Sequence, residues 1–424
     1  MKNFYILDFL KKNSNLDSKK LEILKQEFDF RIYSYGDQFK YAHENKKQKF
    51  STVLFQYLKS VYILLKIFLN KKSDNNKKAI FSSAYFNLND ELSKLGFEVY
   101  SPSWYLKKDG NVLPNFSLFN SSKKILATLS SSNFRDLLTP NFITQIDEFE
   151  KIVLKALKIN NIQAVIVSND ITFIDKILID VCKKLKIPSF LFLHGLPPNF
   201  NLIDNNRTDY LMVWGEKLKE NFIKTGFNKD KIIVTGHPYY KLQVDSPLQF
   251  SLNNVLVLTK PMDEGQFGNK VQLSDRSHSI LYLFSLEKVL RSFGINSVRI
   301  RLHPGENPQW YYQYINEEFF ILDRSNLKKS INNSTLVIGP TSTVFLESIY
   351  YRKNYLVYEP GFYGFDLFNH RLFPPFDGSE NKVPIAKNED ELSQLIKDKT
   401  LVDSSILSDY IRTPFNLEII KKFI

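Results

Sequence analysis

The sequence contains a single cysteine and no long uncharged apolar run. One cysteine, Cys182, among 424 residues excludes a disulfide framework and a cysteine metal cluster. Because apolar residues flank Cys182 at helical spacing, we predict a small buried side chain in a protein of a reducing compartment. No run of about 18 uncharged apolar residues occurs, so we expect no transmembrane helix. The opening Met1-Lys2-Asn3-Phe4 leads to no clean apolar core with a small-residue cleavage site, so we expect no signal peptide.

The charge balance is basic, with a formal net charge of +12 and lysines dense at 46–49 and 71–78. Such a surface attracts nucleic acid, anionic lipid or an acidic substrate. The sequence has neither a Cys/His finger nor an RNA-binding motif, so we expect no nucleic-acid partner. The segments Val53–Leu69 and Leu417–Ile424 are amphipathic and rich in lysine nearby. They either lie on an anionic membrane or face the core with solvated lysines, and the sequence is compatible with both.

Segments of strand and helix type alternate along most of the chain, which predicts an α/β protein. A length of 424 residues suffices for two domains. We predict a first domain over residues 1–245 with a helical N-terminal extension, a second over 250–404, and a C-terminal helix over 405–424 that returns to the first. A polar linker is expected at Gln243–Asn254. The strands expected in the first domain are Ala79–Ser83, Phe97–Tyr100, Ala164–Ser168, Ser189–Leu193, Asp209–Val213 and Ile232–Thr235.

In the second domain a histidine follows directly on a predicted strand. Apolar residues and arginines alternate over Val298–Leu302, the period of a half-buried strand. Two prolines and a glycine end the strand just after His303. Open α/β sheets bind ligands at the carboxyl ends of their strands, so His303 and Pro304 are candidate site residues. The alternative is a histidine that caps its own turn.

An acidic turn follows another predicted strand. The apolar run Asn254–Thr259 is typical of a buried parallel strand. It leads to Asp263-Glu264-Gly265, in which one carboxylate oxygen can point into a cleft. The alternative is an acidic turn in solvent.

A third strand end carries a cluster of hydroxyl groups. The predicted strand Ser334–Ile338 passes through Gly339 into Thr341-Ser342-Thr343, where a helix is expected to begin. The free N–H groups of a helix start, together with these hydroxyls, can bind a phosphate, and otherwise they form an ordinary N-cap. Glu347 lies one turn further on the face of Thr343, where a carboxylate can accept hydrogen bonds from ribose hydroxyls.

Three strand ends of the first domain also carry polar groups. Asp170 is positioned to bind or deprotonate an acceptor hydroxyl, and His194-Gly195 to line the opposite wall of a cleft. For both we hold a turn role equally open. The Gly236-His237-Pro238 turn is expected to have a structural role near the linker.

The ordered set Asp263-Glu264-Gly265, His303-Pro304 and Ser342-Thr343 resembles the motif set of bacterial sialyltransferases. The similarity is to the lipooligosaccharide type and to related capsule enzymes that use CMP-activated nonulosonic acids, and it covers roughly residues 190–360. It implies a GT-B fold, with two Rossmann-like domains facing across a cleft and the donor nucleotide held mainly by the C-terminal domain.

The resemblance also implies a reaction. An inverting glycosyltransferase of this kind moves sialic acid or a related nonulosonic acid from its CMP ester to a hydroxyl of a lipooligosaccharide or capsule glycan. Asp263 would take the acceptor proton, with Glu264 in reserve, and His303 would stabilise the leaving phosphate. Residues 341–343 would hold the phosphate, and Glu347 the ribose.

We expect no cofactor besides the CMP-activated donor, and no metal, because the acidic residues do not cluster with histidines at ligand spacing. The expected partners are the CMP-sugar, the glycan acceptor and an anionic membrane. The expected location is the cytoplasm, peripherally on the inner face of a bacterial inner membrane. The alternatives are a CMP-Kdo or CDP-polyol-phosphate transferase, a UDP- or GDP-sugar transferase, and a non-catalytic glycan- or membrane-binding protein on a GT-B scaffold.

Overall fold

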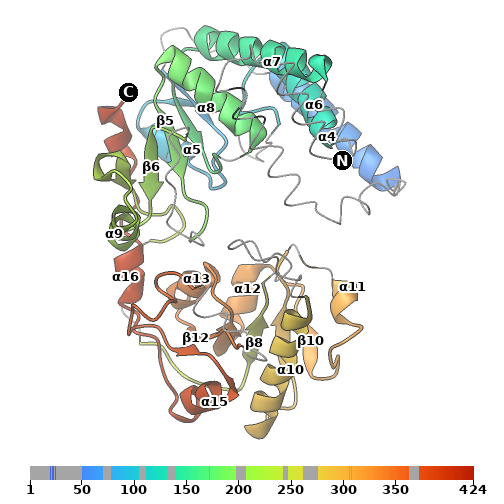
Figure 1. Cartoon of the computed structure of the whole chain (residues 1–424), viewed down its shortest axis with the longest axis vertical. Coiled ribbons are helices and arrows are strands. Elements are labelled where there is room, and N and C mark those ends of the chain that lie inside the picture. The colour runs from blue at the N-terminus through green and yellow to red at the C-terminus, as the bar shows by residue number, and fades with distance from the viewer. Residues whose placement is uncertain are drawn as a thin grey trace.

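The computed structural model of the chain describes residues 20, 22, 24, 50–69, 78–104, 111–130, 139–170, 172–196, 207–241, 247–260, 276–304, 306, 308–361 and 372–424. Two parallel sheets organise these residues, one in each half of the chain. They occupy the upper and lower parts of Figure 1.

The first sheet has seven parallel strands in the order β3-β2-β1-β4-β5-β6-β7. The order reverses between β1 and β4, and ligands of doubly wound sheets bind at such a switch point. The strands are β1 (Ala79–Ser82), β2 (Glu98–Ser101), β3 (Asn111–Val112), β4 (Ile162–Val167), β5 (Ser189–Phe192), β6 (Tyr210–Val213) and β7 (Ile232–Val234).

The second sheet has six parallel strands in the order β10-β9-β8-β11-β12-β13. Its switch point lies between β8 and β11. The strands are β8 (Val255–Leu258), β9 (Val298–Arg301), β10 (Phe320–Leu322), β11 (Leu336–Gly339), β12 (Asn354–Tyr358) and β13 (Ile385–Ala386).

Helices connect these strands, and several begin at a side chain that accepts a backbone N–H. Thr139, Thr172, Asn326 and Asn388 cap α7, α8, α12 and α15 in this way. The helices are α4 (Phe50–Leu69), α5 (Asn89–Lys94), α6 (Phe116–Ser130), α7 (Pro140–Ile159), α8 (Phe173–Leu185), α9 (Glu216–Lys224), α10 (Arg276–Ser292), α11 (Pro308–Tyr311), α12 (Leu327–Asn332), α13 (Val344–Tyr350), α15 (Glu389–Lys397) and α16 (Ile406–Tyr410), with 3₁₀ turns η2 (Lys229–Lys231) and η3 (Glu418–Lys422).

Burial explains why the central strands are nearly all apolar. Every residue of β5, β8, β11 and β12 is buried, as expected for parallel strands covered on both faces. Cys182 lies on α8 as a buried free thiol whose pKa is raised by burial. The prediction of a small buried side chain at this position is confirmed.

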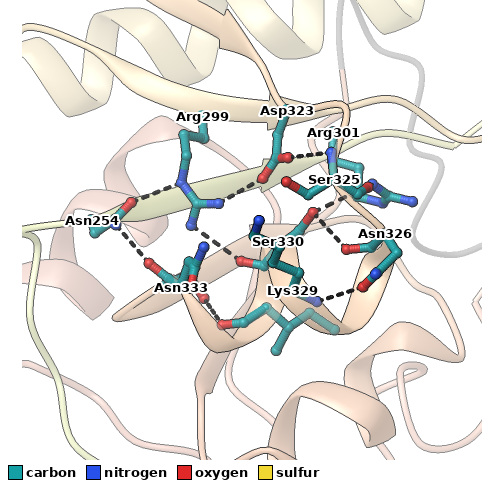
Figure 2. Close-up of polar contacts among 11 residues, drawn as sticks. Asn254, Arg299, Arg301, Asp323, Ser325, Asn326, Lys329, Ser330 and Asn333 are labelled. Atoms are coloured by element: carbon teal, nitrogen blue, oxygen red, sulfur yellow. Dashed lines mark hydrogen bonds and ion pairs between the residues drawn. The ribbon is translucent and has the colours of Figure 1, made fainter.

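Strand β9 is the exception, because alternate residues are arginines that join the sheet to α12 (Figure 2). Arg299 donates to Asn254 Oδ1 (2.9 Å), Asp323 Oδ2 (2.6 Å) and the carbonyl of Ser330 (3.1 Å). Burial raises the pKa of Asp323, but hydrogen bonds from Ser325 and the Arg299 charge bring it below its usual value.

The C-terminal segment returns to the first sheet, and in Figure 1 it runs from the lower domain back to the upper one. The Arg412 N–H donates to the carbonyl of Trp214 (2.7 Å), and the Asn416 N–H to that of Thr235 (2.9 Å). A Cβ on Gly215 would lie 2.4 Å from the backbone of Tyr410, so only glycine allows this approach.

Two parallel Rossmann-like sheets confirm the predicted α/β fold of the GT-B type. The C-terminal return differs from the single helix expected over residues 405–424: it comprises α16, an irregular segment with Pro414, and η3. Proline lacks the N–H that a continuing helix needs. Most of the predicted helical extension over residues 1–77 lies outside the described residues, apart from α4 and helical residues at 20, 22 and 24.

Candidate functional site

A buried carboxylate joins three strand ends of the second sheet. Glu359, just after β12, is 3% exposed. It accepts hydrogen bonds from the N–H and the hydroxyl of Thr341, both at 2.7 Å, and forms an ion pair with Lys260, just after β8. Lys260 Nζ also donates to Thr341 Oγ1 at 2.9 Å. These contacts fix the turn after β11 at the switch point.

This network engages the Thr341 hydroxyl, which was predicted to hold a phosphate. The hydroxyl donates to Glu359 and accepts from Lys260, so its proton is already engaged. Neither Lys260 nor Glu359 was singled out in the sequence. The signal available in the sequence was a charged residue just after a buried strand: Lys260 follows β8, and Glu359 follows β12.

Ser342 and Thr343 lead into α13, which begins at Val344. Ser342 Oγ accepts the Val344 N–H at 3.3 Å, and no described residue accepts the Ser342 hydroxyl proton. Ser342 can therefore still donate to a phosphate oxygen.

Gly339, a candidate substrate-binding residue before the predicted phosphate-binding turn, has protein atoms as its immediate neighbours. A Cβ there would meet the Tyr355 hydroxyl at 2.3 Å and Leu258 Cβ at 3.0 Å. The Tyr355 hydroxyl donates to the Pro340 carbonyl at 2.6 Å. The glycine is therefore required by packing within the sheet.

His303 follows β9 and its side chain is exposed, as is Pro304. The His303 N–H donates to Glu306 Oε2 (2.8 Å) and Thr259 Oγ1 (3.1 Å), while the Glu306 N–H donates to the His303 carbonyl (2.9 Å). Tyr311 also donates to Glu306, and burial beside this carboxylate raises the pKa of Tyr311. Glu306 thus holds the turn that presents the imidazole at the carboxyl edge of the sheet.

Glu347 is half-buried on α13, and no described residue donates a hydrogen bond to its carboxylate. Burial raises its pKa, and the charge of Arg301 partly opposes this. Arg301 Nη1 donates to the Ser325 carbonyl and to Ser330 Oγ (3.3 Å), as Figure 2 shows. Arg301 is thus a cation near Glu347. From the sequence, Arg301 was predicted only to be a strand residue. Asp263, Glu264 and Gly265 lie outside the described residues, and their roles remain predictions.

His194 lies at the carboxyl end of β5 with an exposed side chain. Its Nδ1 is 2.7 Å from the carbonyl oxygen of Ser168, which follows β4. A carbonyl only accepts, so Nδ1 carries the proton and Nε2 of the neutral ring holds the lone pair. The ring is oriented by the protein and presents a proton acceptor to solvent.

The residues after His194 contact the second domain. The Leu196 N–H donates to Thr343 Oγ1 at 2.9 Å, and a Cβ on Gly195 would lie 3.3 Å from the same oxygen. The predicted acceptor-side turn and the predicted phosphate-side turn therefore meet, although 147 positions separate Leu196 and Thr343.

Asp170 does not line an open surface. It is 4% exposed, and its Oδ1 forms an ion pair with Arg207 Nη2 at 2.8 Å. The pair ties the end of β4 to the residues before β6. Its predicted role in binding or deprotonating an acceptor hydroxyl is untested, and this geometry favours a positioning role.

Asp175, near the start of α8, is buried, and this raises its pKa to about 7, with the Asp170 charge adding to the effect. In the unfolded chain the Asp175 carboxyl has a pKa near 3.8, well below its pKa in the folded protein. The contribution of Asp175 to the free energy of unfolding therefore falls as the pH rises from about 4 toward 7. We expect Asp175→Asn to raise the free energy of unfolding at pH 8 by roughly 2–4 kcal/mol. Urea unfolding at several pH values measures this, and a gain that does not shrink between pH 7 and pH 4 contradicts it.

His237 has the structural role predicted for the turn after β7. It is 3% exposed and surrounded by Phe86, Trp214 and Tyr240, with ring centroids at 4.3, 4.7 and 4.8 Å. Burial lowers its pKa to about 3, so it is neutral near pH 7.

A small pocket lies beside the Glu359 network, and His278, which no motif had indicated, forms part of its wall. Its Nε2 is 3.2 Å from the carbonyl of Pro360. Within the described ranges, no group of three or more His, Cys, Asp or Glu side chains is placed to hold a metal ion.

No protein-family model and no curated protein sequence matches the chain. Solved structures similar to it include the UDP-GlcNAc 2-epimerase of Methanocaldococcus jannaschii, with 14% identity over 81% of this chain and 98% of that one, at a TM-score of 0.46. The lipopolysaccharide outer core galactosyltransferase WaaB has 12% identity over 82% and 98%, at 0.43. HepE of Anabaena, in complex with UDP and glucose, has 12% identity over 82% and 99%, at 0.44. The likeness is one of fold.

Proposed function

We propose that this protein is an inverting glycosyltransferase, and that its donor is a CMP-activated nonulosonic acid. The observation that carries the proposal is the contact of Leu196 with Thr343. It brings an oriented histidine of the first domain next to the hydroxyl-bearing turn of the second. The CMP preference rests on the order of the acidic, His-Pro and Ser-Thr motifs. The acceptor proposed is a hydroxyl of a surface glycan.

The reaction needs a base for the acceptor proton. The acceptor oxygen forms a bond to the anomeric carbon, the bond from that carbon to the phosphate oxygen breaks, and its electron pair leaves with CMP. The acceptor proton passes to His194 Nε2, whose lone pair is set by the Ser168 contact. Asp263 is the base that the resemblance implies, so variants of His194 and Asp263 distinguish the two candidate bases.

The leaving phosphate gains negative charge, which needs donors positioned in advance. The exposed imidazole of His303 follows β9 and the hydroxyl of Ser342 follows β11, so they supply donors at strand ends on either side of β8. Arg301 adds positive charge near Glu347, and the half-buried Glu347 carboxylate is proposed to accept hydrogen bonds from the ribose hydroxyls. Thr341 contributes indirectly, by holding the turn in place through Glu359.

We expect CMP to raise the melting temperature more than CDP, UDP or GDP at equal concentration. A ligand that binds only the folded state stabilises it by mass action, about 2.7 kcal/mol at a hundredfold excess over Kd. A thermal-shift series with the four nucleotides measures the preference. A clear preference for UDP or GDP contradicts the CMP donor, and a preference for CDP favours a polyol-phosphate transferase.

The series also addresses a non-catalytic protein on the same scaffold. If no nucleotide shifts the melting temperature at millimolar concentration, the donor site is absent and the transferase proposal fails. If CMP binds but no CMP-sugar is consumed with any surface-glycan acceptor, the chain binds a nucleotide without transferring a sugar.

A further inference from the structure

Helix α4 exposes a continuous apolar face. A single exposed leucine is ordinary in a folded protein, whereas a stripe along one helix marks an interaction surface. The exposed side chains recur at helical spacing, and they are Leu58 (56%), Val61 (36%), Tyr62 (42%), Leu65 (53%), Phe68 (86%) and Leu69 (73%).

The opposite face of α4 is already occupied. Ile63 is buried against Val112 of β3 and Phe119 of α6, and Leu64 and Ile67 pack beside it. The helix is therefore held on the domain by one side, and the apolar stripe faces outward. In Figure 1 α4 runs along the outer side of the upper domain, near α6.

The charges on α4 fit an anionic partner. Its sequence, FSTVLFQYLKSVYILLKIFL, contains no aspartate or glutamate. Its two lysines, Lys59 and Lys66, are seven residues apart and share one border of the exposed stripe. Lys66 Nζ lies 5.3 Å from the ring centroid of Tyr62. Lysines beside an apolar stripe can bury their stems and keep the ammonium groups at lipid phosphates.

We propose that α4 is an interfacial helix that docks the first domain on an anionic lipid bilayer. The stripe enters the boundary between headgroups and acyl chains, the helix axis stays parallel to the surface, and the lysines contact anionic headgroups. The packed face with Ile63 remains on the protein.

The test is co-flotation of the full chain with vesicles of phosphatidylethanolamine and phosphatidylglycerol, compared with phosphatidylcholine alone. We expect binding to the anionic vesicles that weakens as the salt rises above about 0.15 M. The triple variant Leu58→Gln, Leu65→Gln, Phe68→Gln is expected to bind roughly 100-fold more weakly, because three side chains no longer enter the bilayer. The double variant Lys59→Gln, Lys66→Gln is expected to lose the preference for anionic vesicles.

A matched control replaces exposed apolar residues elsewhere. Phe284, Ile321 and Leu401 are 46%, 48% and 44% exposed, so their replacement by glutamine removes similar exposed apolar groups from the second domain. This control is expected to bind as the wild type does. Wild-type protein that does not float with anionic vesicles, or an α4 variant that floats as well as the control, overturns the proposal. The proposal is also overturned if the wild type is a dimer that binds no vesicles and the α4 variant is a monomer. In that case the stripe binds a second copy of the chain.

Discussion

His194→Asn is expected to reduce sugar transfer by about 10²–10⁴-fold, the usual contribution of a general base. The asparagine amide can keep the donor position that Nδ1 uses toward the Ser168 carbonyl, but it lacks a proton acceptor at the position of Nε2. Because His194 is not proposed to contact the nucleotide phosphate, CMP should stabilise the variant about as much as the wild type. Turnover with a saturating donor, together with the CMP thermal shift, measures both effects.

Three variants serve as controls for this prediction. His303→Ala should weaken CMP binding as well as turnover, since a charge-assisted contact is worth roughly 1.5–3 kcal/mol. Asp263→Asn and Glu264→Gln test the carboxylates that the resemblance implies. If the His194 variant transfers normally and Asp263→Asn is inactive, the base is Asp263; if Glu264→Gln is the inactive one, it is Glu264.

Sequence periodicity found most of the strands that build the fold, but it missed β10 and the buried five-residue strand β12. The apolar runs before His194, Lys260, His303 and Gly339 are β5, β8, β9 and β11, and each was predicted to within two residues. Parallel strands buried on both faces have this composition because no alternating polar face is needed. The short strands β3 and β13 have two residues each, too few to give a periodic signal.

Residues of the candidate site could be proposed from the sequence only where a reactive side chain lies next to a predicted strand end. His194, His303 and Ser342 are at such ends, and the structure places them at the carboxyl edges of the two sheets. Periodicity cannot predict contacts between residues that lie far apart in the sequence. Glu359 meets Thr341 only because β11 and β12 are neighbours in the sheet, and Leu196 meets Thr343 only because the two domains touch.

The same limit applies to two of the predicted site residues. Asp170 and Thr341 have the right chemistry for a site, but Asp170 Oδ1 is paired with Arg207, and the Thr341 hydroxyl is engaged by Lys260 and Glu359. An ion pair between residues far apart in the chain leaves no trace in local sequence, because each partner alone is an ordinary charged residue at a turn.

Lys260→Met is expected to lower the free energy of unfolding by roughly 3 kcal/mol. Removing one partner of a buried ion pair leaves an uncompensated charge, at a typical cost of about 3–5 kcal/mol, and the low end applies because the Lys260 side chain is 24% exposed. The Glu359 carboxylate is the buried partner and would keep only the hydrogen bonds from Thr341. Since those bonds orient the turn at Ser342, CMP should also stabilise the variant less.

The double variant Lys260→Met, Glu359→Gln tests whether the loss of stability comes from the unpaired Glu359 charge or from the lost packing of the lysine side chain. A neutral amide in place of the carboxylate removes the uncompensated charge, so the double variant should recover more than half of the lost stability. The pair Lys288–Glu389 is the matched control, with lysine and glutamate side chains 75% and 34% exposed. Lys288→Met should leave urea unfolding unchanged within error, because exposed pairs are screened by solvent. If Lys260→Met is as mild as Lys288→Met, Glu359 is held by Thr341 alone, and the ion pair does not position the site.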